Sequence, residues 1–279
     1  MTRSRCADLS EAAREPISAT ATNALNWLLV EVRGTWPRDV SDPGGLGPEL
    51  GTEVANWLER TPSSRVLFIR RPGRAPEQRA VFVVHASERE PLVRRLELSD
   101  VHGLDPARGG AEVSSQLVLV CGHGTRDACC ALRGSAAFGA LRETVPSDDL
   151  WFSSHQGGHR FAANVLVLPV GIQLGRVTLD DAAGVVSDAL QGRIALEHYR
   201  GRVAYTAREQ AAERAVRESR GLVRATDLAL VGDDGTQVTF RHPDGNELRA
   251  IPKEIAGPAV PASCGADPEP QRHYAADLG

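Results

Sequence analysis

Two cysteines and two histidines lie at spacings that could bind a metal ion or a metal cluster. Cys121 and Cys130 bound a loop that follows an apolar segment, and His155 and His159 lie in a later loop that precedes another apolar segment. Two thiols and two imidazoles are ligands of borderline softness, which favours zinc or an iron-sulfur cluster over calcium or magnesium. These four side chains are the candidate site.

The spacing of the cysteines favours a cluster over a single zinc ion. Structural zinc sites often hold two cysteines that are only two to four residues apart, whereas eight residues separate Cys121 from Cys130. A binuclear cluster is larger than one ion, so a wide cysteine loop and a short His-x-x-x-His loop could enclose it from two sides. A zinc ion bound by the same four residues, as the staple of a binding module, stays an alternative.

Two neighbouring residues compete for roles in this site. Cys129 directly precedes Cys130 and could replace it as a ligand, and His123 stands two residues after Cys121, a Cys-x-His spacing that can itself bind metal. Thiol-disulfide chemistry at the pair Cys129 and Cys130 is disfavoured, because adjacent cysteines form strained disulfides and the sequence has no Cys-x-x-Cys motif.

The order of these residues resembles a known family. The pattern Cys121-x-His-Gly-x-Arg-Asp-x-x-Cys130, followed by His155-x-Gly-Gly-His159-x-Phe-Ala-x-Asn, is similar to the sucrase/ferredoxin-like family. The resemblance implies a thioredoxin-like ferredoxin that carries a [2Fe-2S] cluster, which some members hold through two cysteines and two histidines. Carried over, Cys121 and Cys130 would bind one iron, and His155 and His159 the other. The family's cysteine separation favours Cys130 over Cys129.

A mixed ligand set of this kind predicts an electron carrier. An oxidised [2Fe-2S] core carries a charge of +2, so two thiolates and two neutral imidazoles would leave the site neutral, and a neutral site accepts an electron more readily than one held by four thiolates. Histidine-ligated clusters accordingly reach about −150 to +300 mV, against about −400 mV for plant-type ferredoxins. We expect a raised, pH-dependent reduction potential and a reductase as electron donor. Direct reduction of a bound substrate, such as a ferric chelate, is the alternative from the enzyme class.

The composition excludes several other classes of function. The chain of 279 residues has 32 lysines and arginines against 36 aspartates and glutamates, which gives a net charge of −4. Without a basic patch in the sequence we expect no nucleic acid and no anionic membrane as partner. No apolar run reaches the ~20 residues of a membrane-spanning helix. Five cysteines in a chain of this length do not predict a disulfide framework, so we expect a cytoplasmic protein.

The remaining pattern predicts an α/β protein. Apolar runs of strand length alternate with helical periodicity, and Asp127 is placed to cap a helix over 128–141. We expect a flexible lead-in over residues 1–20 that contains Cys6, and an irregular tail over residues 257–279 in which Cys264 is a free thiol. Between them we expect an N-terminal α/β part over 21–110, a thioredoxin-like ferredoxin part over 111–200, and a C-terminal extension of one helix and a β-meander over 201–256.

Overall fold

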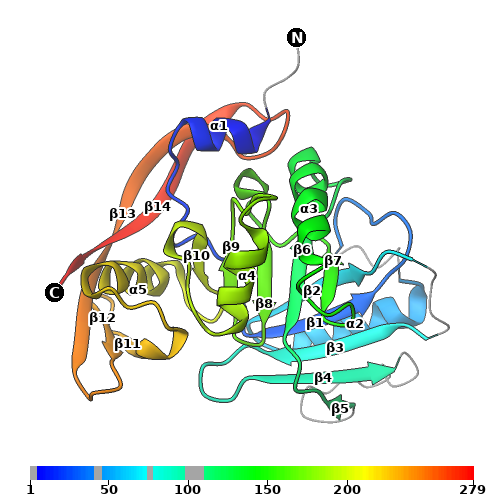
Figure 1. The fold of residues 1–279 in the computed structure, drawn as a ribbon, viewed down its shortest axis with the longest axis horizontal. Helices are drawn as coiled ribbons and strands as arrows, with labels where there is room; N and C mark the ends of the chain where they lie inside the picture. The colour runs from blue at the N-terminus through cyan, green and yellow to red at the C-terminus, as the bar shows by residue number, and fades with distance from the viewer. Residues whose placement is uncertain (1–4, 41–45, 74–77, 98–109) are drawn as a thin grey trace.

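A mixed sheet of ten strands runs through the middle of the molecule, in the order β10-β9-β8-β6-β7-β2-β1-β3-β4-β5 (Figure 1). The structure is a computed structural model, and it describes residues 5–40, 46–73, 78–97 and 110–279. The strands of this sheet are β1 (Asn26–Glu31), β2 (Ser64–Arg70), β3 (Ala80–His85), β4 (Leu92–Glu97), β5 (Ala111–Glu112), β6 (Leu117–Cys121), β7 (Leu150–Ser153), β8 (Val165–Leu168), β9 (Ile172–Leu174) and β10 (Tyr199–Arg202).

A second, antiparallel sheet of four strands closes the C-terminal end, in the order β11-β12-β13-β14. Its strands are β11 (Ala229–Asp233), β12 (Val238–Arg241), β13 (Glu247–Pro261) and β14 (Pro268–Leu278). The described α-helices are α1 (Cys6–Ala12), α2 (Pro48–Arg60), α3 (Ala128–Leu141), α4 (Ala182–Leu190) and α5 (Ala207–Arg220), and the short 3₁₀ helices are η3 (His159–Phe161), η4 (Leu196–His198) and η5 (Ala225–Asp227).

The large sheet contains the same strand arrangement twice. In the first unit β1 and β2 pair in parallel, and α2 connects them along the chain. Strand β3 pairs antiparallel with β1, and β4 pairs antiparallel with β3, which gives the order β2-β1-β3-β4. In the second unit β6, α3, β7, β8 and β9 repeat these directions in the order β7-β6-β8-β9. This is the strand arrangement of a thioredoxin-like fold, so the predicted α/β class is confirmed. The two units meet where β2 pairs antiparallel with β7.

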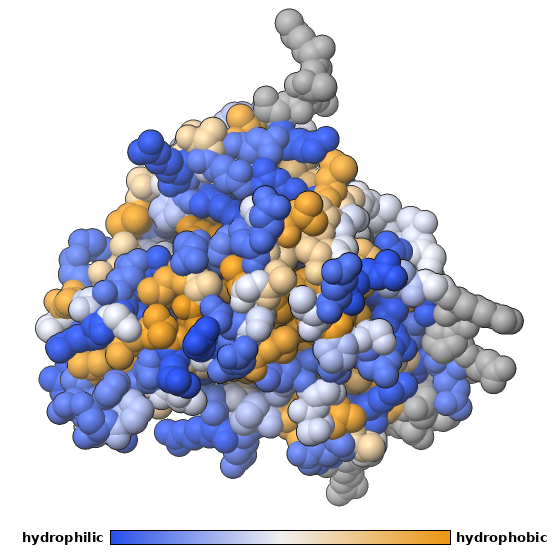
Figure 2. Space-filling view, in the orientation of Figure 1, coloured by the Kyte–Doolittle hydropathy of each residue, from blue (hydrophilic) through white to orange (hydrophobic). Residues whose placement is uncertain are grey.

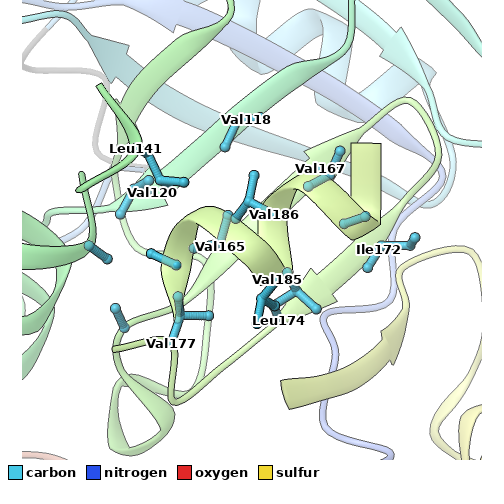
Figure 3. Close-up of a cluster of buried hydrophobic side chains, with 14 of the residues drawn as sticks. Val118, Val120, Leu141, Val165, Val167, Ile172, Leu174, Val177, Val185 and Val186 are labelled. Carbon is cyan, nitrogen blue, oxygen red and sulfur yellow. The ribbon is translucent and has the colours of Figure 1, made fainter. Parts of the chain in front are cut away.

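The central strands are buried on both faces, which explains their continuous apolar sequences. Successive side chains of a strand point to opposite faces, and in β6 Val118 and Val120 join one core cluster while Leu117 and Leu119 join another. The first cluster lies between the sheet and the helices α3 and α4, as Figure 3 shows for Val165, Val185 and their neighbours. This packing holds the cysteine strand rigidly in the sheet.

Helix α5 covers the second sheet. Its N-terminus has a capping box between Thr206 and Glu209, and Gly221 ends it in the left-handed conformation, the usual signals of a helix start and stop. Val216 and other apolar residues of α5 pack against Phe240 and Val238 of the sheet.

On the face drawn in Figure 2, hydrophobic residues form several patches that hydrophilic side chains divide.

Two predictions for the ends of the chain are wrong. The tail that was expected to be irregular forms a long hairpin of β13 and β14, whose residues pair across ten registered positions from Ala250 to Pro261. The lead-in that was expected to be flexible contains α1, and Cys6 at the start of this helix is fully buried. Both segments lack a strong apolar periodicity of their own, so the sequence does not predict their order, and packing against other parts of the molecule supplies it. Figure 1 shows α1 lying across the far end of the hairpin.

The helix predicted in the middle of the chain is confirmed. The helix over 128–141 has the predicted bounds, and the Asp127 side chain accepts a hydrogen bond from the Cys129 backbone N–H at 2.8 Å. The boundary predicted near residue 110 adjoins residues 98–109, which lie outside the described part of the chain. Among the described helices, none is long and apolar enough to cross a membrane.

Candidate metal centre

The candidate ligands meet at one edge of the large sheet. Strands β6 and β7 are parallel, so their carboxyl ends lie together, and this edge is where open α/β sheets place their sites. Cys121 is the last residue of β6, and His155 follows β7 after a single residue. Cys130 lies in the first turn of α3, which begins above the same edge.

Three of the four predicted ligands converge closely. One ligand atom from each of Cys121, Cys130 and His155 lies within 4.8 Å of the other two. Both cysteines are fully buried and His155 is half-buried. The fourth residue, His159, is not part of this close group, but its ring centroid lies 4.9 Å from that of His155. The structure therefore brings two thiols and two imidazoles to one place, with His159 at its margin beside Asp127.

The imidazoles have buried nitrogen atoms without well-formed hydrogen bonds to the described residues. These atoms are Nδ1 of His155 and both ring nitrogens of His159. Buried polar groups are nearly always satisfied, so such atoms require an explanation, and an absent ion or ligand is one. Nε2 of His159 lies 3.9 Å from Oδ2 of Asp127, beyond hydrogen-bonding distance. The donor set thus fits a bound metal group better than it fits a satisfied polar core.

The protonation states of the site suit metal binding. The Cys130 thiol donates to Cys121, and this lowers the pKa of Cys121 while it raises that of Cys130. Burial lowers the pKa of His159, although the nearby Asp127 carboxylate opposes the shift. Metals bind thiolates and neutral imidazoles, and these shifts favour the thiolate of Cys121 and the neutral form of His159.

His123 is a positioning residue in this structure. Its Nδ1 accepts a hydrogen bond from the His155 backbone N–H at 3.1 Å, and its Nε2 then donates to the Pro37 carbonyl at 2.9 Å. Its ring packs edge-on against Trp36. Both ring nitrogens of His123 make hydrogen bonds. His123 therefore supports the histidine loop, and neither of its nitrogens is available to bind a metal.

The histidine loop turns tightly and is held from behind. Gly157 and Gly158 have positive φ angles of 91° and 68°, a conformation that glycine adopts without strain. The buried Arg200 guanidinium donates to the Gly157 carbonyl at 2.9 Å and to the Asn164 side chain at 2.8 Å. Asn164 in turn donates to the Gly158 carbonyl at 3.0 Å. These bonds fix the loop that carries His155 and His159.

Two arginines place positive charge behind the thiols. Arg65 donates to the His155 carbonyl at 3.0 Å, and burial lowers its pKa while the charge of Cys121 opposes that shift. Burial also lowers the pKa of Arg200 to about 9, with Cys121 and Cys130 again opposing. Neither arginine stands out in the sequence, because each comes from a strand far from the cysteine and histidine motifs.

Cys129 faces a different set of residues from Cys130. One ligand atom from each of Cys6, Asp127, Cys129 and Cys264 lies within 4.8 Å of the other three. The Cys6 thiol donates to Cys129 and lowers its pKa to about 6. The structure thus places Cys130 with Cys121, as the resemblance implies, and places Cys129 in a second group that no sequence motif predicts. The only sequence signal for this group is that the sequence motifs assign Cys6 and Cys264 to no other site.

Fold and site define a thioredoxin-like α/β protein with a cysteine and histidine centre. The profile of the sucrase/ferredoxin-like family matches residues 17–201. The chain belongs to this family, as its motifs indicate. The match covers both thioredoxin-like units and ends within β10, before α5 and the C-terminal sheet.

Curated relatives match a shorter part of the chain. Altered inheritance of mitochondria protein 32 from Meyerozyma guilliermondii is 31% identical over 102 residues, which are 33% of this chain and 36% of the relative. The protein of the same name from Debaryomyces hansenii is 32% identical over 102 residues, or 37% of its length. The chain thus spans a little over a third of these relatives. No solved structure matches it significantly.

Proposed function

We propose that this chain is an electron-transfer protein whose [2Fe-2S] cluster is held by Cys121, Cys130, His155 and His159. One observation carries the proposal: two fully buried thiols lie with two imidazoles at one edge of the sheet, and the imidazoles have buried nitrogens that make no well-formed hydrogen bond to the described residues. Membership of the sucrase/ferredoxin-like family supports it. When bound, the cluster would supply a one-electron redox couple, and the protein's own residues would set its potential and its access.

The surroundings favour a raised reduction potential. With two thiolates and two neutral imidazoles the oxidised site would be neutral, and reduction would make it negative. Arg65 and Arg200 stand behind the histidine loop, and positive charge nearby stabilises the reduced form. We expect the potential to exceed that of plant-type ferredoxins, and to fall in the alkaline range where a bound imidazole loses its second proton.

The histidine side of the site is the route for electrons. Cys121 and Cys130 are fully buried, whereas His155 is half-buried, so the histidine loop lies nearer to solvent. We propose that a reductase docks over this loop and donates the electron. All five cysteines are free thiols, which supports a reducing compartment such as the cytoplasm.

The test compares two adjacent cysteines. Wild-type protein purified without oxygen should be red-brown and hold about two irons and two sulfides per chain, the content of one [2Fe-2S] cluster. Cys130→Ser should lose most of this iron and the visible absorption, while Cys129→Ser should keep both, because the thiol of Cys129 groups with Cys6 and Cys264 and not with Cys121.

Three results would contradict the proposal. A Cys130→Ser protein with a normal cluster would show that the ligand set is wrong. Colourless wild-type protein whose zinc disappears in Cys130→Ser would show that the same residues form a structural zinc module. Steady turnover of a ferric chelate by the red-brown protein alone would instead make the chain a reductase in its own right.

A further inference from the structure

Three thiols that are far apart in the sequence converge at a second place. The Sγ atoms of Cys6 and Cys129 lie 3.6 Å apart, those of Cys129 and Cys264 lie 3.4 Å apart, and those of Cys264 and Cys6 lie 3.6 Å apart. Oδ1 of Asp127 lies 3.2 Å from Sγ of Cys264 and 3.7 Å from Sγ of Cys6. Five of the six distances among these four ligand atoms thus lie between 3.2 and 3.7 Å, and the sixth, between Asp127 and Cys129, is within 4.8 Å.

The four residues come from three separate elements. Cys6 begins α1, Asp127 and Cys129 lie at the start of α3, and Cys264 lies in the turn between β13 and β14. In Figure 1 the start of α3, α1 and the far end of the hairpin lie in the same region of the molecule. More than 250 residues separate Cys6 from Cys264 (264 − 6 = 258). Only the tertiary fold can bring together three thiols that lie near both ends and in the middle of the chain.

The distances fit one metal ion. A tetrahedral ion with ~2.3 Å bonds to sulfur separates its sulfur ligands by ~3.8 Å, and shorter bonds to oxygen bring the oxygen to ~3.5 Å from each sulfur. A disulfide would bring two sulfurs to ~2.05 Å, and all three cysteines are free. An iron-sulfur cluster would hold the thiols farther apart than the observed 3.4–3.6 Å on all three edges.

We propose that Cys6, Cys129, Cys264 and Asp127 bind a single Zn²⁺ ion at a site distinct from the Cys121 centre. Three thiolates select a soft or borderline metal over calcium or magnesium, and a closed four-ligand tetrahedron is the form of a structural zinc site. The ion links α1 and the tip of the β13–β14 hairpin to the start of α3. The inference does not depend on the proposed iron-sulfur cluster.

The surroundings of these residues support a bound cation. The Asp127 carboxylate is oriented by the backbone N–H groups of Cys129 and Cys264, each at 2.8 Å, and such supporting bonds fix a ligand in place. Three thiolates and one carboxylate around Zn²⁺ carry a net charge of −2, which lies at the N-terminus of the fourteen-residue helix α3, where the helix dipole favours negative charge. Cys264 is half-buried, so the hairpin turn offers a path of entry.

The experiment measures zinc and iron together in the full chain. Wild-type protein from zinc-supplemented cells should hold about one zinc per chain. Cys6→Ser and Cys264→Ser should each reduce the zinc content at least tenfold and leave the iron content unchanged. Ser263→Ala, in the same hairpin turn but outside the donor set, should keep its zinc. Cys130→Ser should show the opposite pattern, with zinc kept and iron lost.

A measurement on the unmutated protein guards against variants that fail to fold. X-ray absorption at the zinc edge should show about three sulfur neighbours and one lighter neighbour, the donor set of this site. Two sulfurs and two nitrogens would place the zinc at the Cys121 centre and overturn the inference. It would also be overturned by wild-type protein that holds no zinc, by zinc that persists in both serine variants, or by a disulfide among these three cysteines.

Discussion

Cys129 and Cys130 are adjacent in the chain, yet their thiols lie in different ligand groups. Successive residues of an α-helix are turned by about 100° around its axis, so two neighbours in the first turn of α3 point in different directions. Cys130 points to Cys121 and His155, and Cys129 points to Cys6 and Cys264. A helix start thus supplies one thiol to each of two sites without any conflict between them.

A charge close to the proposed cluster should tune its potential. Arg65→Gln removes a guanidinium that donates to the His155 carbonyl at 3.0 Å, so the reduced site loses a stabilising positive charge. We expect the reduction potential to fall by on the order of 40 mV, the equivalent of ~1 kcal/mol for one electron. A potentiometric titration followed by the visible spectrum measures the shift at constant pH.

The control for this change is Arg71→Gln, at the residue that follows the end of the same strand. Arg71 stacks over Trp151 and pairs with the exposed Asp148, and its guanidinium donates hydrogen bonds to Ser147 and Asp148 rather than to the ligand residues. The reduction potential of the Arg71→Gln protein should equal that of the wild type. An unchanged potential in the Arg65→Gln protein would show that Arg65 does not raise the reduction potential of the site.

At the scale of elements, the site depends on how closely α3 approaches the end of β6. Gly134 is buried in the middle of α3, and a Cβ atom there would lie only 2.1 Å from the Cys121 carbonyl oxygen. The absence of a side chain is therefore what lets the helix pack against the strand. The same contact sets the distance between Cys130 on the helix and Cys121 on the strand.

Gly134→Ala should damage both stability and the metal centre. The added methyl group collides with backbone atoms, which cannot move aside as a flexible side chain could, and overpacking of this kind costs about 1–3 kcal/mol. We expect a lower unfolding temperature and a reduced iron content per chain, measured by thermal melting and elemental analysis.

Gly139→Ala is the matched control in the same helix. Gly139 is exposed and no atom lies within 4 Å of a Cβ placed there, so the substitution should stabilise the helix by up to ~1 kcal/mol and keep the iron. Equal effects of the two substitutions would contradict the proposed close contact.

At the scale of the whole molecule, one buried carboxylate joins segments from the beginning, middle and end of the chain. Glu15 follows α1 and accepts hydrogen bonds from Ser10 at 2.6 Å and from Arg160, next to His159, at 2.7 Å. His273 of β14 lies 3.2 Å away. Burial opposes the ionisation of Glu15, but the interactions with His273, Ser10 and Arg160 outweigh it and lower its pKa.

This lowered pKa predicts part of the acid sensitivity of the fold. The ionised form stabilises the folded state above the ordinary pKa of 4.5, and the contribution is lost as the pH falls through the lower folded-state value. Glu15→Gln should therefore lose on the order of 2–4 kcal/mol at pH 7, where Arg160 is left without its partner, and should lose less further stability than the wild type between pH 5 and pH 3.

Urea unfolding at several pH values measures both effects, with the exposed Glu269→Gln as control. The control should follow the wild type at every pH. A Glu15→Gln protein with wild-type stability at pH 7 would show that this buried contact does not hold the three segments together.

The sequence by itself determined the parts of this protein that depend on local pattern. Apolar runs predicted the central strands, Asp127 marked the start of α3, and the spacing of Cys121, Cys130, His155 and His159 indicated one site. These signals are local because strand alternation, helix capping and short ligand loops each act within a few residues.

Tertiary structure alone decided the contacts between distant segments. The duplicated strand order, the hairpin that replaces the expected irregular tail and the burial of Cys6 all depend on surfaces that other parts of the chain supply. Cys6, Cys129 and Cys264 have no recognisable spacing, because a site whose ligands come from three separate elements is defined only after those elements pack together.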